Sequence, residues 1–190
     1  MVHCYGGMTK KLMISEIDRR ELQEQLGRSP RGVLNVSSRC PEGHPAVVRT
    51  KPLIRSGGGF EIFPTLFWLT CPEMVRKVSS VEAIGYIERL ERELRRSSQM
   101  RSKYRKQTED YRGERWNMLS SQERAFISKR GLKAELEKGI GGVGDVDHLK
   151  CLHMHVAHHL ARENIIGKLV LERFAIRKCP EPHSRDKQAV

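Results

Sequence analysis

Apolar side chains recur at three- and four-residue intervals in several stretches of this chain, which is the periodicity of an amphipathic helix. The pattern predicts helices over residues 14–26, 80–94, 121–138, 151–160 and 165–177. Ser79 and Ser120 each stand three residues before a glutamate, so both match a capping box, and we expect a helix to begin at each. Ser15 or Asp18 should cap the first helix and Gly27 should end it, and Asp145 or Asp147 should cap the fourth.

Three shorter stretches have the composition of strands, and they cover residues 33–36, 46–49 and 65–70. The third is the most apolar and aromatic part of the chain, so we expect it to be buried. A serine and three glycines at 56–59 should form a flexible break. The predicted fold class is therefore α+β, with a small antiparallel sheet of about three strands in the N-terminal third and a mostly helical C-terminal two-thirds.

The 190 residues fit a single domain, with a loose leader at 1–12 and a tail at 178–190. Between the helices, residues 95–118 should form a basic helical arm or linker. From residue 95 to 115 the apolar stripe thins and eight of 21 residues are Lys or Arg. Such a charged helix is typical of a solvated surface, and its interleaved tyrosines also fit contact with a nucleic-acid strand.

The overall charge is strongly basic, with 35 Lys and Arg against 23 Asp and Glu, a net charge of +12. A positive balance of this size favours nucleic acid or another acidic partner. No apolar run approaches the roughly 20 residues that a membrane-spanning helix needs, and residues 1–11 lack the apolar stretch of a signal peptide. We therefore expect a cytoplasmic protein without membrane contact. Its oligomeric state stays open.

Cysteine and histidine chemistry concentrates in residues 150–160, which hold four of the eight histidines and one of the five cysteines. On a helix, Cys151, His155, His158 and His159 share one face within about 100° of arc, beside a separate apolar stripe. An odd number of widely spaced cysteines in a reducing compartment indicates free thiols or metal ligands rather than disulfides.

Two more cysteines, Cys40 and Cys71, stand at turns, and a proline follows each. If the fold gathers them with Cys151 and with His155 or His158, three thiolates and an imidazole form a tetrahedral site for zinc or an iron–sulfur cluster. The alternative is that the three cysteines are small buried apolar residues. No Cys-x-x-Cys pair is present to decide between the two.

Two other functions compete with metal binding. One is a nucleic-acid-binding or ribosome-associated module that uses the basic helical arm and a basic turn, through Arg28, Arg31, Arg101, Lys103, Arg105 and Lys106. The other is a thiol or histidine enzyme, since a cysteine at a helix N-terminus beside imidazoles can have a lowered pKa. No oxyanion hole or substrate pocket is visible in the sequence, so whether the protein is an enzyme stays uncertain.

Four blocks of sequence occur in an order that resembles a bacterial protein family. They are Gln25–Arg28 with Pro30, Arg39–Pro41 with Gly43 and Pro45, Phe63–Pro72, and Lys150–His153 with His155, Ala157 and His158. Together, from Leu26 to Gly167, they resemble the family catalogued as domain of unknown function 501. The resemblance implies a bacterial intracellular protein and names no activity. Many members carry a second cysteine where this chain has Glu42, so a Cys-x-Cys pair is missing here.

Overall fold

A computed structural model describes residues 14–57, 59–63 and 65–177. The expected leader at 1–12 and tail at 178–190 lie outside the described residues, as do Cys4 and Cys179.

The three predicted strands are present and form one antiparallel sheet in the order β1-β2-β5. They are β1 (Val33–Arg39), β2 (Pro45–Thr50) and β5 (Phe67–Leu69). Val36 lies opposite Val48, and Val47 lies opposite Leu69. Valine, phenylalanine and leucine favour this pleated and largely buried surface. The predicted fold class is confirmed, because this sheet occupies the N-terminal part and helices dominate the rest.

A second antiparallel pair was missed, namely β3 (Leu53–Ser56) and β4 (Gly59–Ile62). The predicted flexible break at 56–59 includes the end of β3 and the start of β4, where Ser56 pairs with Gly59. Gly57 has φ +56°, the left-handed conformation that tight hairpin turns need.

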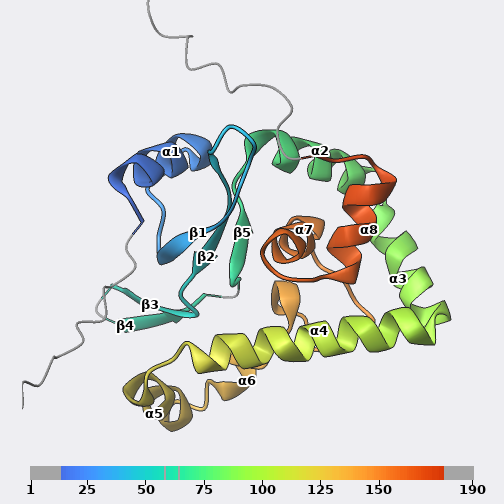
Figure 1. Cartoon of the computed structure of the whole chain (residues 1–190). Helices are drawn as coiled ribbons and strands as arrows, with labels where there is room; N and C mark the ends of the chain where they lie inside the picture. Colours follow the sequence, from blue (N-terminus) through green and yellow to red (C-terminus); the bar gives the residue numbers. More distant parts are fainter. Residues whose placement is uncertain (1–13, 58, 64, 178–190) are drawn as a thin grey trace, which may run out of the picture.

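Helix α1 (Glu16–Leu26) begins and ends where its capping signals predict. The Ser15 hydroxyl accepts the Asp18 backbone N–H at 3.0 Å, and Gly27 closes the helix with φ +65°. The fully buried Leu22 packs with the partly buried Trp68 in a small core on this face of the sheet. In Figure 1, α1 and α7 lie on opposite sides of the sheet.

The capping box predicted at Ser79 is wrong. Helix α2 (Pro72–Ala83) already begins after Cys71, with Pro72 in its first turn, and Gly85 separates it from α3 (Tyr86–Arg96). The Ser79 hydroxyl donates instead to the Val75 carbonyl one turn earlier, at 2.9 Å. Proline at the start and glycine at the end therefore outweigh the capping-box pattern.

The second capping box is confirmed at Ser120 and Glu123, which exchange side-chain and backbone hydrogen bonds. It opens α5 (Ser121–Lys129), but this helix stops well before residue 138. Gly131 has φ +66°, and a short α6 (Lys133–Leu136) and a 3-10 turn (Ile140–Gly142) follow.

The segment predicted as a basic arm is the 20-residue helix α4 (Ser98–Asn117), and one of its faces is buried. Tyr104 and Tyr111 are 1% and 2% exposed. Arg115 is fully buried, and it forms no salt bridge with any residue that the structure describes. Its guanidinium donates to the backbone carbonyls of Phe63, Leu136 and Lys138 at 2.9–3.2 Å. This helix is thus packed on one side and basic on the other.

Helix α7 (Leu152–Ala161) lies at the centre of the molecule, between β5 and α8 (Ile165–Arg173), as Figure 1 shows. Asn164 caps α8 by accepting the Gly167 N–H at 2.8 Å. Gly167 lies against the backbone of His155, so these two helices approach unusually closely. Because α7 is covered on several sides, the ligand-bearing face predicted from its sequence is mostly core.

None of the helices within the described ranges combines the length and the apolar composition required to cross a bilayer.

Candidate functional site: a cysteine–histidine–glutamate cluster

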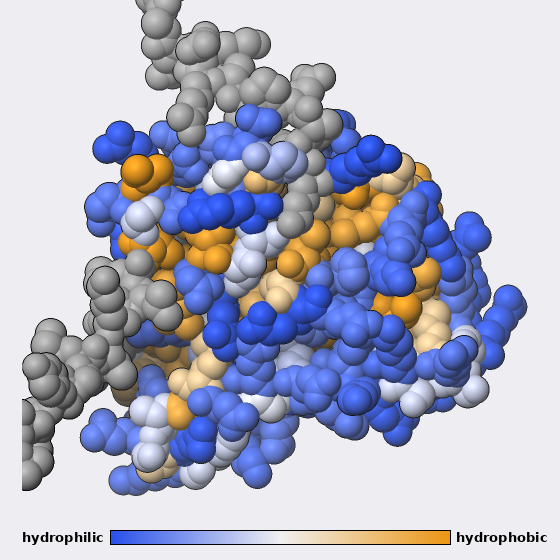
Figure 2. Space-filling view, in the orientation of Figure 1, coloured by the Kyte–Doolittle hydropathy of each residue, from blue (hydrophilic) through white to orange (hydrophobic). Residues whose placement is uncertain are grey.

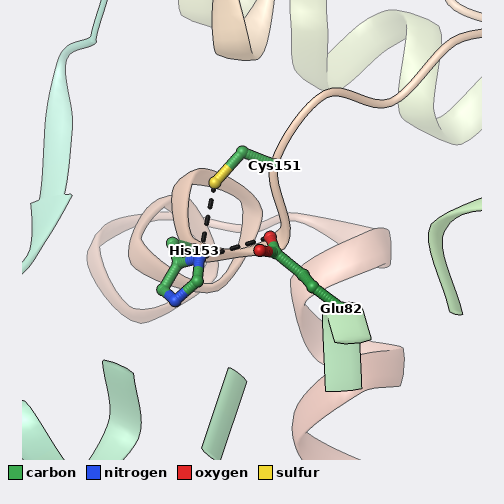
Figure 3. A group of neighbouring side chains, drawn as sticks. All are labelled: Glu82, Cys151 and His153. Carbon is green, nitrogen blue, oxygen red and sulfur yellow. Dashed lines mark hydrogen bonds and ion pairs between the residues drawn. The ribbon is translucent and has the colours of Figure 1, made fainter. Parts of the chain in front are cut away.

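A carboxylate, a thiol and an imidazole meet where the end of α2 lies beside the start of α7 (Figure 3). Glu82 is in the last turn of α2, Cys151 is the residue before α7, and His153 is in the first turn of α7. His153 Nδ1 is 3.2 Å from Glu82 Oε1 and 3.4 Å from Cys151 Sγ. One ligand atom from each residue lies within 4.8 Å of the other two.

The far side of the imidazole is held by the backbone of α2. His153 Nε2 lies 3.1 Å from the Val75 carbonyl oxygen and 3.1 Å from the Ser79 hydroxyl. A carbonyl only accepts hydrogen bonds, so the Nε2–H donates to Val75. This contact fixes the ring orientation and leaves Nδ1 directed at the Glu82 and Cys151 side chains.

Glu82 also replaces the cap that the sequence predicted for α7. Its Oε1 accepts the Leu152 backbone N–H at 2.5 Å, so a carboxylate from α2 satisfies the first turn of α7. The expected caps, Asp145 and Asp147, do not serve this helix. The Asp145 carboxylate accepts backbone N–H groups of residues 147 and 148, in the turn that precedes α7.

The charges of the cluster favour a protonated imidazole when no metal is bound. Burial lowers the pKa of His153, but the Cys151 sulfur, the Glu82 carboxylate and the Val75 carbonyl oppose it and raise the pKa to about 9. The three side chains are only partly buried, with 26% of the Glu82 side chain and 22% of the His153 side chain exposed. The cluster is therefore in contact with solvent.

The five metal ligands predicted from the sequence do not form one group in the described part of the chain. Cys151 alone belongs to the cluster that the structure contains. Cys40 is 5% exposed at the turn between β1 and β2, and Cys71 is 1% exposed just before α2. Both pack in the main hydrophobic core, as in the alternative of small buried apolar residues.

His155 and His158 point into the protein interior rather than toward a shared ion. His158 stacks on Phe67, with ring centroids 5.6 Å apart, and Asn164 Nδ2 lies 3.2 Å from its Nδ1. The His155 ring is fully buried against Tyr104, with centroids 5.6 Å apart. Burial lowers the pKa of His155 to about 3 and that of His158 to about 4, so both are neutral at pH 7.

Sequence reasoning missed Glu82 and His153. The Cys-x-His spacing of 151 and 153 was a usable signal, because it places both side chains at the N-terminus of one helix. No signal of this kind marks Glu82, which is 69 residues from Cys151 and reaches it through tertiary packing.

The residues predicted to bind nucleic acid divide into two separate regions. Arg28 lies over the Trp68 ring at 5.4 Å, and Arg31 pairs with Glu61 at 2.9 Å, both near the sheet. The others are on α4, where Arg101 pairs with Asp147 and Lys103 with Glu163, while Arg105 and Lys106 are exposed. Figure 1 places the sheet and the N-terminal half of α4 at opposite sides of the molecule.

The fold and cluster define an α+β protein with a thiol–imidazole–carboxylate group between two helices. A family described as "Protein of unknown function (DUF501)" matches residues 36–172, most of the chain, and the protein belongs to this family. The match confirms the resemblance seen in the sequence blocks. Searches among curated proteins and among solved structures found no match.

Proposed function

We propose that the protein binds a zinc ion through Glu82, Cys151 and His153. The observation that carries this proposal is that three chemically suitable ligand atoms lie within 4.8 Å of one another. Thiolate sulfur, imidazole nitrogen and carboxylate oxygen are the three ligand types that zinc takes in proteins. A bound ion would link the end of α2 to the start of α7.

The surroundings of the imidazole support this assignment. Metal-binding histidines usually donate their second ring N–H to a carbonyl or a carboxylate, which orients the ring. The Nε2 of His153 has such a partner in the Val75 carbonyl at 3.1 Å. Its Nδ1 is then the ligand atom, and metal binding would displace the proton that the raised pKa places there.

An iron–sulfur cluster fits this group less well than zinc does. Such clusters are held mainly by several cysteine thiolates, whereas this group contains one. Three protein ligands leave one position of a tetrahedral zinc ion for water or another small ligand. The partial exposure of the cluster agrees with such a position.

A cysteine–histidine hydrolase is disfavoured by the same geometry. In a catalytic triad, the nucleophile and the orienting group contact opposite nitrogens of the imidazole. Here Cys151 and Glu82 both approach Nδ1, and a backbone carbonyl takes Nε2. The Leu152 N–H beside Cys151 already binds Glu82, so it is not open to an oxyanion.

Cobalt substitution tests the proposal, because thiolate ligands give Co²⁺ a charge-transfer band in the near ultraviolet. Metal-free protein should bind one Co²⁺, with a band of the intensity expected for one thiolate, and zinc should displace it. Cys151→Ser should abolish the band, while His153→Asn and Glu82→Gln should each weaken zinc binding at least tenfold. His148→Asn is the matched control, since His148 is exposed and pairs with Asp145 outside the cluster.

Two results would overturn the assignment. One is a band of three-thiolate intensity that Cys40→Ser or Cys71→Ser also reduces, because it would indicate the ligand set predicted from the sequence. The other is the absence of stoichiometric zinc binding in a chelator-competition titration of folded protein.

A further inference from the structure

A groove lined by arginines lies at the corner where α3 ends and α4 begins. Six residues line a cavity of about 370 Å³ there, namely Arg95, Arg96, Ser98, Arg101, Ser102 and Arg105. Arg101 and Arg105 are one helical turn apart on α4, so they lie on the same face. The extended backbone of Ser97 turns the chain and brings this face beside the end of α3. We call this feature the arginine groove.

The positive charge of the arginine groove exceeds the negative charge around it. No acidic residue lines the cavity among the described residues. Arg101 pairs with Asp147, and Arg95 lies 3.9 Å from Glu91. Arg96 and Arg105 are exposed and have no ion pair within the described ranges. Four guanidinium groups thus face two carboxylates at this corner, which leaves a local excess of positive charge.

We propose that the arginine groove binds the phosphodiester backbone of a single-stranded nucleic acid without reading its bases, and RNA oligonucleotides serve as the probe. Guanidinium groups match phosphate oxygens with paired, parallel hydrogen bonds, and serine hydroxyls are also common phosphate donors. The arginine groove carries four guanidinium groups and two serine hydroxyls.

The burial of the nearby tyrosines excludes base stacking on them. The sequence predicted that aromatic residues of this segment could contact a nucleic-acid strand. Tyr104 and Tyr111 are 1% and 2% exposed, so neither offers a ring face to a base. Non-specific single-strand binders normally stack bases on such rings. The described lining of the arginine groove thus offers no aromatic ring to a base, and phosphate oxygens are the partners that its guanidinium and hydroxyl groups suit best.

A lipid surface fits the arginine groove less well than a nucleic acid does. Helices that bind membranes in the plane of the interface insert apolar side chains beside their basic residues. In the part of the chain that the structure describes, no apolar residue lines the groove. Figure 2 shows a mainly hydrophilic surface over α4, in agreement with this difference.

Counterion release sets the size of the expected effect. With four phosphate contacts on a single strand, the slope of log affinity against log salt is about −0.7 × 4, or about −2.8. Raising the salt from about 50 to about 200 mM should then weaken binding about 50-fold. Removing two of the arginines should halve the slope, so the same change in salt weakens binding only about 7-fold.

The test is fluorescence anisotropy of the full chain with labelled A20 and U20 RNA oligonucleotides. The variant Arg96→Gln/Arg105→Gln should bind at least tenfold more weakly at low salt and show the halved slope. The matched control is Arg20→Gln/Lys129→Gln, which also removes two exposed charges, from α1 and α5. The control should bind as the wild type does, and A20 and U20 should bind about equally.

Three results would overturn the proposal. Equal losses in both double variants would mean that binding depends on overall charge. A strong preference between A20 and U20 would mean that bases are read. Binding to vesicles containing phosphatidylserine but not to either RNA would assign the arginine groove to a membrane surface. Cys151→Ser should leave RNA binding unchanged, so failure of the zinc proposal does not affect this test.

Discussion

Two glycines in helices should respond in opposite directions to the same substitution. Gly167 is in α8 against the backbone of α7, and Gly113 is exposed in α4. A methyl group at Gly167 would lie 2.2 Å from the His155 carbonyl oxygen and 2.7 Å from His159 Cβ. At Gly113 it would meet no atom of the described residues within 4 Å.

The geometry sets the magnitude of each change. Real Cβ atoms essentially never make contacts under 3.0 Å, so Gly167→Ala forces α7 and α8 apart. Because the opposing atom is backbone, no side-chain rotation relieves the contact. Overpacking of this kind costs about 1–3 kcal/mol, and we expect about 3 kcal/mol or more. Gly113→Ala should stabilise by about 0.5–1 kcal/mol, since glycine in a helix loses more backbone entropy than alanine does.

Urea denaturation followed by circular dichroism measures both variants. With a slope of about 2–3 kcal/mol per M, the Gly167→Ala midpoint should fall by about 1 M or more, and the Gly113→Ala midpoint should rise slightly. If Gly167→Ala changes the free energy of unfolding by less than about 0.5 kcal/mol, α7 and α8 do not pack as closely at Gly167 as the structure shows.

Two further predictions concern groups buried in the core. First, His155 and His158 stay neutral in the fold at pH values where the unfolded chain protonates them. The free energy of unfolding should therefore fall as the pH drops from about 6.5 toward 4, by about 2–3 kcal/mol for each histidine at pH 4.5. Urea titrations at pH 7 and 4.5 measure this loss, and equal stability at both would refute it. Second, Arg115→Met leaves three backbone carbonyls without their donor, which should cost about 2–4 kcal/mol in the same assay. Arg112→Met, which removes an exposed hydrogen bond to Gly144, should cost less than about 1 kcal/mol.

Local chemistry made several elements predictable from the sequence. Ser15 begins α1, Gly27 ends it, and the Ser120 capping box opens α5. Each of these signals acts within one helical turn, so it can be recognised from neighbouring residues. The apolar stretch that contains β5 is buried as predicted. The capping-box pattern at Ser79 is also a local signal, but it did not start a helix, because the local signals of Pro72 and Gly85 are stronger.

The sequence by itself therefore determined the α+β class, the three-stranded sheet and the starts of α1, α5 and α8, since these depend on composition and on contacts between near neighbours. Only the tertiary structure decided which helix faces are covered. It buried His155 and His158, left Cys40 and Cys71 in the core and brought Glu82 to Cys151 and His153. Glu82 and Cys151 are 69 positions apart, and the packing of α2 against α7 depends on surfaces that no local pattern records.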